Sequence, residues 1–127
     1  MDKIIFEGMT KQRFLQEAQM KPVICFGAGN LMKFVDSTII RPNKLKVKYL
    51  VANSSRKQGQ TYLGYEVYAP EKLLEEPIGS FVVLITTYYA YEVNEQLEAM
   101  GIREAYPAAL FTEDIIGNFR AIPLNRW

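Results

Sequence analysis

The segment that most constrains the fold is VICFGAGN, residues 23–30, where four apolar side chains stand directly before Gly-Ala-Gly-Asn. Pro22 and Gly27 bound the apolar run, which predicts a short strand buried on both faces, as parallel strands are. Apolar residues at helical spacing follow over residues 30–40, and the pair Arg41-Pro42 ends them. Strand, glycine turn and helix in this order predict the first half of a βαβ unit.

The rest of the chain continues the alternation of strand and helix. Further strands are predicted at residues 45–52, 65–68, 80–87 and 103–108, and further helices at 10–20, from Pro70 onward and at 91–102. We therefore expect an α/β fold: a single three-layer Rossmann-like domain over residues 1–127, with a mostly parallel sheet of about four to five strands. Its core spans about residues 20–107, between an N-terminal helix (10–20) and a C-terminal extension (108–127).

The order of the strands is also predicted. Short connections and right-handed crossovers place the VICF strand beside the FVVLIT strand, with the KVKYLV strand on its other side and REAY next outward.

Composition narrows the class of protein. With 127 residues, 49% apolar and 23% charged residues and a net charge of +1, the chain suits one soluble domain and does not favour nucleic acid as a partner. No apolar run approaches the roughly 20 residues of a membrane helix, so we expect a cytoplasmic protein without membrane insertion. One cysteine excludes a disulfide within the chain. The absence of histidine removes the commonest metal ligand and general base, and no metal site is expected.

The glycine turn is the first candidate binding site. A strand that enters a helix through Gly-x-Gly brings bare backbone amides and a helix N-terminus together, which favours a phosphate group. We therefore predict binding of a nucleotide by Gly27, Ala28, Gly29, Asn30 and Leu31. The alternative is that glycine only permits a positive φ in a tight turn.

Two other strand ends add candidate residues. Asn53 and Ser54 end the second strand, where the dinucleotide fingerprint has an acidic residue that binds the ribose hydroxyls. We predict that they contact the ligand there; the alternative is that they only form a turn. Thr86 and Thr87 end the strand expected next to the first, and their hydroxyls can donate to a ligand. Tyr88, like the tyrosines after it, can stack on a base or a sugar, or can instead be a core or dimer-contact residue.

Candidates for catalysis are poor. Tyr68 and Lys72 have the Tyr-x-x-x-Lys spacing of short-chain dehydrogenases, but Pro70 marks a junction between strand and helix, so we interpret the match as chance. Cys25 lies inside the first strand and is interpreted as a small buried hydrophobic residue. We assign no catalytic residue, and we do not expect the isolated chain to turn over a nucleotide sugar.

Three stretches carry a resemblance to a known type of domain: residues 23–30, residues 49–73 (YLVANSSRKQGQTYLGYEVYAPEKL) and residues 82–102 (VVLITTYYAYEVNEQLEAMGI). They resemble the Rossmann-like nucleotide-sugar or CoA-binding type of domain in bacterial surface-polysaccharide biosynthesis proteins, over about residues 20–107. The resemblance implies that Gly27 and Gly29 form the phosphate turn and that Asn53 replaces the usual Asp. It also implies NAD(P) or a nucleotide sugar as ligand, with CoA as a further possibility.

The expected function is therefore nucleotide binding in bacterial polysaccharide or sugar-nucleotide metabolism. One alternative is an interaction module that docks a glycosyltransferase or self-associates; a second is a sugar-nucleotide dehydrogenase or epimerase. We also expect a homo-oligomer or a complex with a partner enzyme, because the chain has 13% aromatic residues and an apolar C-terminal stretch. Phe119 and Trp127 are the candidates for that contact.

Overall fold

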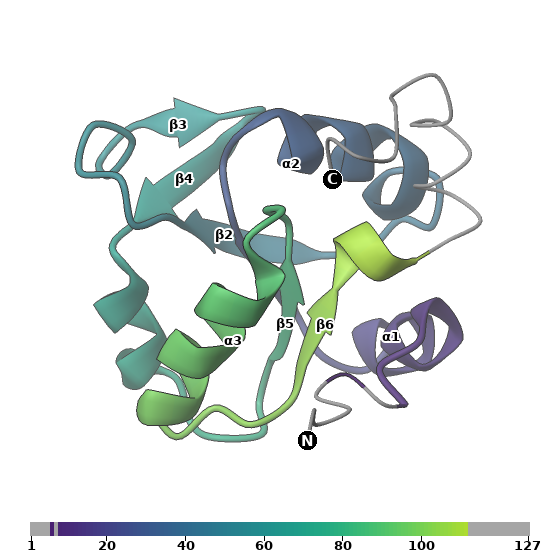
Figure 1. Cartoon of the computed structure of the whole chain (residues 1–127). Helices are drawn as coiled ribbons and strands as arrows, with labels where there is room; N and C mark the ends of the chain where they lie inside the picture. The colour runs from purple at the N-terminus through teal and green to yellow at the C-terminus, as the bar shows by residue number, and fades with distance from the viewer. Residues whose placement is uncertain (1–5, 7, 112–127) are drawn as a thin grey trace, which may run out of the picture.

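A computed structural model describes residues 6 and 8–111 of the chain (Figure 1). In chain order its elements are α1 (Lys11–Ala18), β1 (Val23–Phe26), α2 (Asn30–Val35), η1 (Asp36–Ile40), β2 (Val47–Val51), β3 (Thr61–Tyr62), β4 (Tyr65–Tyr68), η2 (Pro70–Glu75), β5 (Val82–Ile85), α3 (Ala90–Ala99), β6 (Ala105–Pro107) and η3 (Ala108–Leu110). Among these residues, no helix has the length and apolar character needed to cross a bilayer.

One sheet of six strands forms the centre of the fold, in the order β3-β4-β2-β1-β5-β6. β4, β2, β1, β5 and β6 run parallel, and only β3 is antiparallel to its neighbour. The predicted α/β class, the mostly parallel sheet and the predicted order of β2, β1, β5 and β6 are confirmed. Because these five strands point in the same direction, their carboxyl ends lie together at one edge of the sheet.

The number of strands was underestimated at four to five, because β3 was missed. β3 and β4 form a hairpin whose two connecting residues, Leu63 and Gly64, have φ angles of 56° and 88°. Positive φ at both central residues is the geometry of a type I′ turn, for which Asn-Gly is the typical sequence. Here leucine, which rarely adopts a left-handed conformation, stands in the place of asparagine, so the sequence Leu-Gly does not indicate the hairpin.

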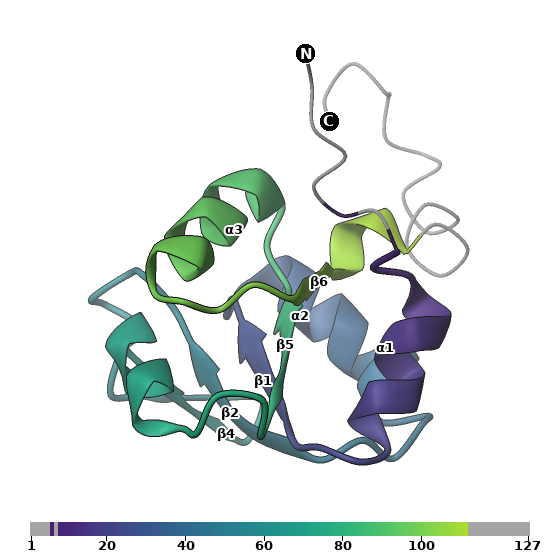
Figure 2. The same ribbon diagram turned by 90° about the horizontal axis from the view of Figure 1, so that it is seen from below.

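Helical segments cover both faces of the sheet, as Figure 2 shows. Alternate side chains of β1 divide between two hydrophobic clusters. Val23 and Cys25 pack with α1, α2 and η1, whereas Ile24 and Phe26 pack with η2 and α3. All four side chains are at most 2% exposed, which explains why this strand has no polar residue.

The helix predicted over residues 30–40 changes geometry half-way, because η1 is a π-helical turn that continues α2. Its first residue, Asp36, is only 4% exposed. The carboxylate accepts hydrogen bonds from Arg41 Nε at 2.6 Å and from the Tyr65 hydroxyl at 2.7 Å. These bonds attach η1 to β4, and they satisfy a charge that would be costly to bury alone.

The folded unit extends beyond residues 20–107 at both ends. Thr10 caps α1 by accepting a hydrogen bond from the Arg13 amide, as an N-cap threonine does. The ring of Phe14 then lies 5.6 Å from that of Tyr106 and 6.0 Å from that of Phe111, measured between centroids. The predicted contact residues Phe119 and Trp127 lie outside the described residues.

Candidate ligand-binding site

A cleft of about 610 Å³ opens at the carboxyl ends of β1, β2 and β5. The helices that follow β1 and β5 cover opposite faces of the sheet, so the chain diverges here and leaves a crevice, which is where open α/β sheets bind ligands. All ten residues predicted for the site line this one cleft, although they come from three separate parts of the sequence.

The two glycines of the turn differ in whether the fold requires glycine at that position. Gly27 has a φ of +141°, and a Cβ at this position would lie 2.6 Å from the Thr86 carbonyl oxygen, so only glycine fits against the end of β5. The simple structural alternative therefore accounts for Gly27. Thr86 is 1% exposed, and its hydroxyl donates to the Gly27 carbonyl at 3.1 Å, so this hydroxyl closes the turn within the protein.

Gly29, in contrast, has no structural need for glycine. It is the N-cap of α2 with φ −131° and ψ −151°, an extended conformation that any residue can adopt, and no side chain caps this helix end. An added Cβ would meet only Lys57 Nζ, at 3.5 Å, which is an ordinary contact. Glycine here leaves the backbone bare where it lines the cleft. Ala28 and Leu31 also line the cleft, with side chains buried in the core, whereas Asn30 is exposed.

Two side chains orient the peptide groups of the turn. Lys57 Nζ donates to the Ala28 carbonyl at 2.9 Å, and the Tyr62 hydroxyl donates to the Gly29 carbonyl at 2.8 Å. In a trans peptide the carbonyl and the following N–H point in opposite directions. The amides of Gly29 and Asn30 are therefore turned away from Lys57 and Tyr62, and side by side they offer two donors to an anion.

The end of β2 is engaged in a contact across the cleft. Asn53 Nδ2 donates to Gln96 Oε1 at 3.0 Å, and Gln96 Nε2 donates to Asn53 Oδ1 at 2.9 Å, so the two amides form a reciprocal pair. The side chain predicted to bind ribose thus already has a partner on α3. Ser54 is exposed, and its carbonyl accepts the amides of Lys57 and Gln58, which makes a turn of this segment.

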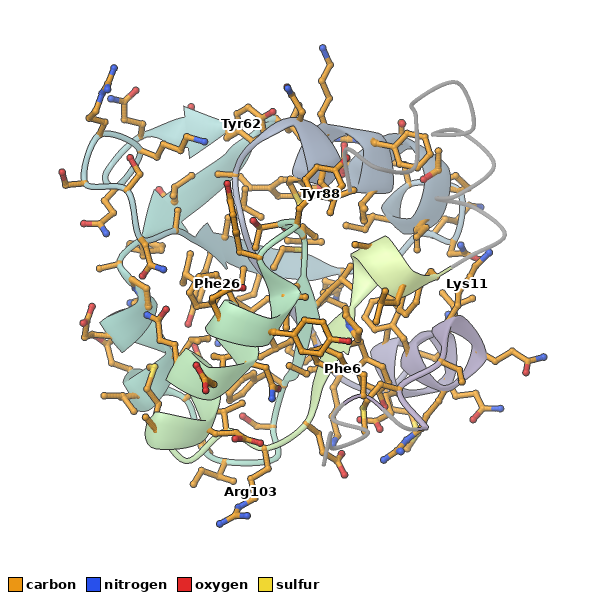
Figure 3. All side chains as sticks on the ribbon, in the orientation of Figure 1. Phe6, Lys11, Phe26, Tyr62, Tyr88 and Arg103 are labelled. Carbon is orange, nitrogen blue, oxygen red and sulfur yellow. The ribbon has the colours of Figure 1, made fainter. Side chains whose placement is uncertain are left out.

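The loop after β5 forms the aromatic side of the cleft. Thr87 accepts a hydrogen bond from the Tyr89 amide at 3.4 Å. Tyr88 is 48% and Tyr89 68% exposed, so both rings present apolar area at the rim. Partial burial raises the pKa of Tyr88, and the phenol stays protonated at neutral pH. Figure 3 shows Tyr88 on this side and Tyr62 on the β3 side of the molecule.

Sequence reasoning did not assign seven further residues to the cleft: the apolar Phe26, Ala52 and Val93, and four residues with polar groups, Lys57, Tyr89, Glu92 and Gln96. Tyr89 had been weighed only as one of a cluster of tyrosines. Glu92 and Gln96 follow Tyr89 by three and seven residues, a spacing that places all three on one face of α3. This periodicity can be read from the sequence. The position of Lys57 in the cleft cannot, because it depends on the fold of the loop after β2.

The geometry offers no pair of nucleophile and base in this cleft. Lys72 Nζ lies over the ring of Tyr68, 4.9 Å from its centroid, while the Tyr68 hydroxyl bonds to Glu66, so the two are not arranged as a catalytic pair. Neither lines the cleft. Burial and the nearby Asp36 raise the pKa of the Cys25 thiol, which disfavours the thiolate. Within residues 6 and 8–111, no group of three potential metal ligands occurs.

Comparison with known families corrects the resemblance drawn from the sequence. A family model described as C2185-like, N-terminal, matches residues 19–107. The match overturns the assignment to the nucleotide-sugar or CoA-binding domains of polysaccharide biosynthesis. The motifs behind that assignment, a glycine turn and short strand and helix boundaries, report local geometry that unrelated α/β families share. No curated protein matches the chain.

Proposed function

We propose that the chain, which belongs to the C2185-like, N-terminal family, is a Rossmann-like domain that binds a nucleotide through the turn between β1 and α2. The parallel strands support this proposal, because their order β4-β2-β1-β5-β6 corresponds to 3-2-1-4-5, the order of dinucleotide-binding sheets. In such sheets the ligand lies at the carboxyl ends of the central strands, which is where the 610 Å³ cleft opens.

The observation that carries the proposal is Gly29. The fold itself requires glycine at residue 27, because a side chain there would clash with Thr86. Gly29 makes room for nothing in the protein, yet it lines the cleft with a bare backbone. Together with the amides of Gly29 and Asn30, this bare backbone suits the close approach of a phosphate group.

The proposal concerns binding and assigns no reaction to this chain. In the part of the chain that the structure describes, the cleft contains Glu92 as its single carboxylate and no cysteine. The tyrosines at the rim suit stacking on a base, a contact worth about 1–3 kcal/mol per base.

The proposal is tested by calorimetry on Gly29→Val with AMP, ADP, NAD and a UDP-sugar as ligands. A valine at residue 29 fits the extended backbone but covers the amides of the turn, so we expect affinity to fall at least tenfold while the melting temperature changes little. Ser37→Val is the matched control, since it places the same side chain on an exposed part of the same helical segment, outside the cleft. The proposal is wrong if none of these nucleotides binds the parent protein at millimolar concentration.

A second candidate function is protein–protein contact at the tyrosine rim. Tyr89 and Tyr91 are 68% and 56% exposed, and the ring of Tyr91 lies 5.3 Å from that of Phe6, measured between centroids, which extends the aromatic area. Sedimentation equilibrium of the parent and of Tyr89→Ser would separate the two functions. Self-association lost in the variant supports contact, whereas nucleotide binding lost in Gly29→Val supports the first proposal.

A further inference from the structure

The edge of the sheet where β1, β5 and β6 begin carries exposed apolar side chains. Ile78, between η2 and β5, is 86% exposed, and Met20, between α1 and β1, is 85% exposed; these are the highest values among the large apolar side chains that the structure describes. The two loops meet, because the Val82 amide donates to the Pro22 carbonyl at 3.0 Å. An apolar area therefore faces solvent at the edge opposite the cleft.

A tight turn holds Ile78 in this position. The Ser80 amide donates to the Pro77 carbonyl at 3.1 Å, and the Ser80 hydroxyl donates to the same carbonyl at 2.6 Å. Gly79 has a φ of 86° and Ile78 has no positive φ, which is the pattern of a type II turn. This turn type favours proline at the position of Ile78, so the turn does not require a large apolar side chain there. The isoleucine is held rigidly, and a contact made through it costs little conformational entropy.

A pocket of about 420 Å³ lies beside the turn. Its lining includes Ile78 itself and the half-buried Phe81 and Ile102. One surface thus combines a projecting apolar side chain with an apolar hollow. A two-fold symmetric contact uses this combination, because each copy presents the same surface to the other and can place its projection in the hollow of the other.

Charged side chains around the pocket balance one another. Two cations, Lys21 and Arg103, and two carboxylates, Glu17 and Glu104, line it. A surface with charges of one sign would repel a second copy of itself, whereas a surface with both signs can pair each charge with its opposite. The balance therefore favours a second copy of this chain over a strongly acidic or basic partner.

Arg103 is a charge that such a contact can pair. Glu104 pairs with Arg13 of α1 at 3.2 Å, whereas Arg103 has no carboxylate within 4 Å among the described residues. Figure 3 shows Arg103 extending into solvent at the end of the molecule away from Tyr88. A second copy docked at this edge brings Glu17 and Glu104 of its own pocket toward Arg103.

We propose that this edge of the sheet is a homodimer interface, in which two copies meet about a two-fold axis. Ile78 of each copy enters the pocket of the other, and Arg103 of each copy lies beside the carboxylates of the other. The inference does not depend on nucleotide binding, because the cleft lies at the opposite edge and stays accessible in this dimer. In a symmetric contact every substitution acts twice, so single changes have large effects on association.

Sedimentation velocity from micromolar to millimolar concentration tests the interface. The parent should form a dimer. Ile78→Ser should weaken it at least tenfold, because the variant removes the apolar side chain from both copies without changing the charge. The side chain is exposed, so the variant should unfold in urea as the parent does. Leu110→Ser is the matched control, since it makes a similar change at an exposed leucine of η3 outside the pocket.

Charge provides a second readout. Arg103→Glu places a carboxylate against Glu17 and Glu104 of the second copy, so the dimer should weaken at low salt. Sodium chloride should then partly restore it by screening the repulsion. Lys33→Glu is the matched control, because it makes the same charge change on an exposed part of α2 outside the pocket.

The outcomes decide which surface is used. A parent protein that stays monomeric at millimolar concentration overturns the inference, and so does a dimer that Ile78→Ser leaves intact. A dimer that is lost in Tyr89→Ser but kept in Ile78→Ser lies at the tyrosine rim instead. If a control variant weakens the dimer as much as its matched change, the effect is not specific to this edge and the inference is wrong.

Discussion

At the scale of single residues, the two glycines of the turn are expected to respond differently to the same substitution. Gly27→Ala puts a Cβ 2.6 Å from the Thr86 carbonyl oxygen at a φ of +141°, and we expect a loss of about 3 kcal/mol of unfolding free energy. Gly29→Ala meets only an ordinary contact with Lys57, and we expect a change below about 1 kcal/mol. Urea denaturation of both variants measures this. Equal losses would contradict the different roles assigned to the two positions.

At the scale of elements, the attachment of η1 to β4 gives the stability a dependence on alkaline pH. Burial, and then the hydrogen bond to Asp36, raise the pKa of Tyr65 to about 12, above the value near 10 of an unfolded chain. A raised pKa of this kind stabilises the protein below pH 10, and the contribution is lost as the pH rises through about 12. Tyr65→Phe should therefore cost about 1 kcal/mol at pH 8 and progressively less above pH 10, as measured by denaturation at each pH. A cost that is the same at all these pH values would contradict the assignment.

At the scale of the whole molecule, Cys25 reports whether the two hydrophobic clusters unfold together. Its side chain is fully buried in the central strand, and burial raises the pKa of the thiol. We expect a thiol reagent at pH 8 to modify Cys25 only when the sheet opens, so that the labelling rate rises with urea in proportion to the unfolded fraction. Labelling of the unfolded protein gives the reference rate. A native protein that is labelled at a rate independent of urea would show a local opening of β1 instead.

Much of the fold follows from local patterns. The apolar runs at β1 and β5 and the Pro22 and Gly27 boundaries identify buried parallel strands, and β4 has the predicted bounds Tyr65–Tyr68. The order of β2, β1, β5 and β6 then follows from short, right-handed connections. All ten predicted site residues meet in one cleft for the same reason, since parallel strands bring their carboxyl ends to one edge.

What the sequence determined by itself was where strands end and which residues stand there, because apolar periodicity and glycine or proline boundaries act over a few positions. Only the tertiary structure decided what those residues do. The Thr86 hydroxyl is used by Gly27, the Asn53 amide is paired with Gln96, and Lys57 reaches the Ala28 carbonyl. Each of these bonds joins residues at least 29 positions apart. Such contacts depend on how helices and loops pack against the sheet, and no local pattern encodes that packing.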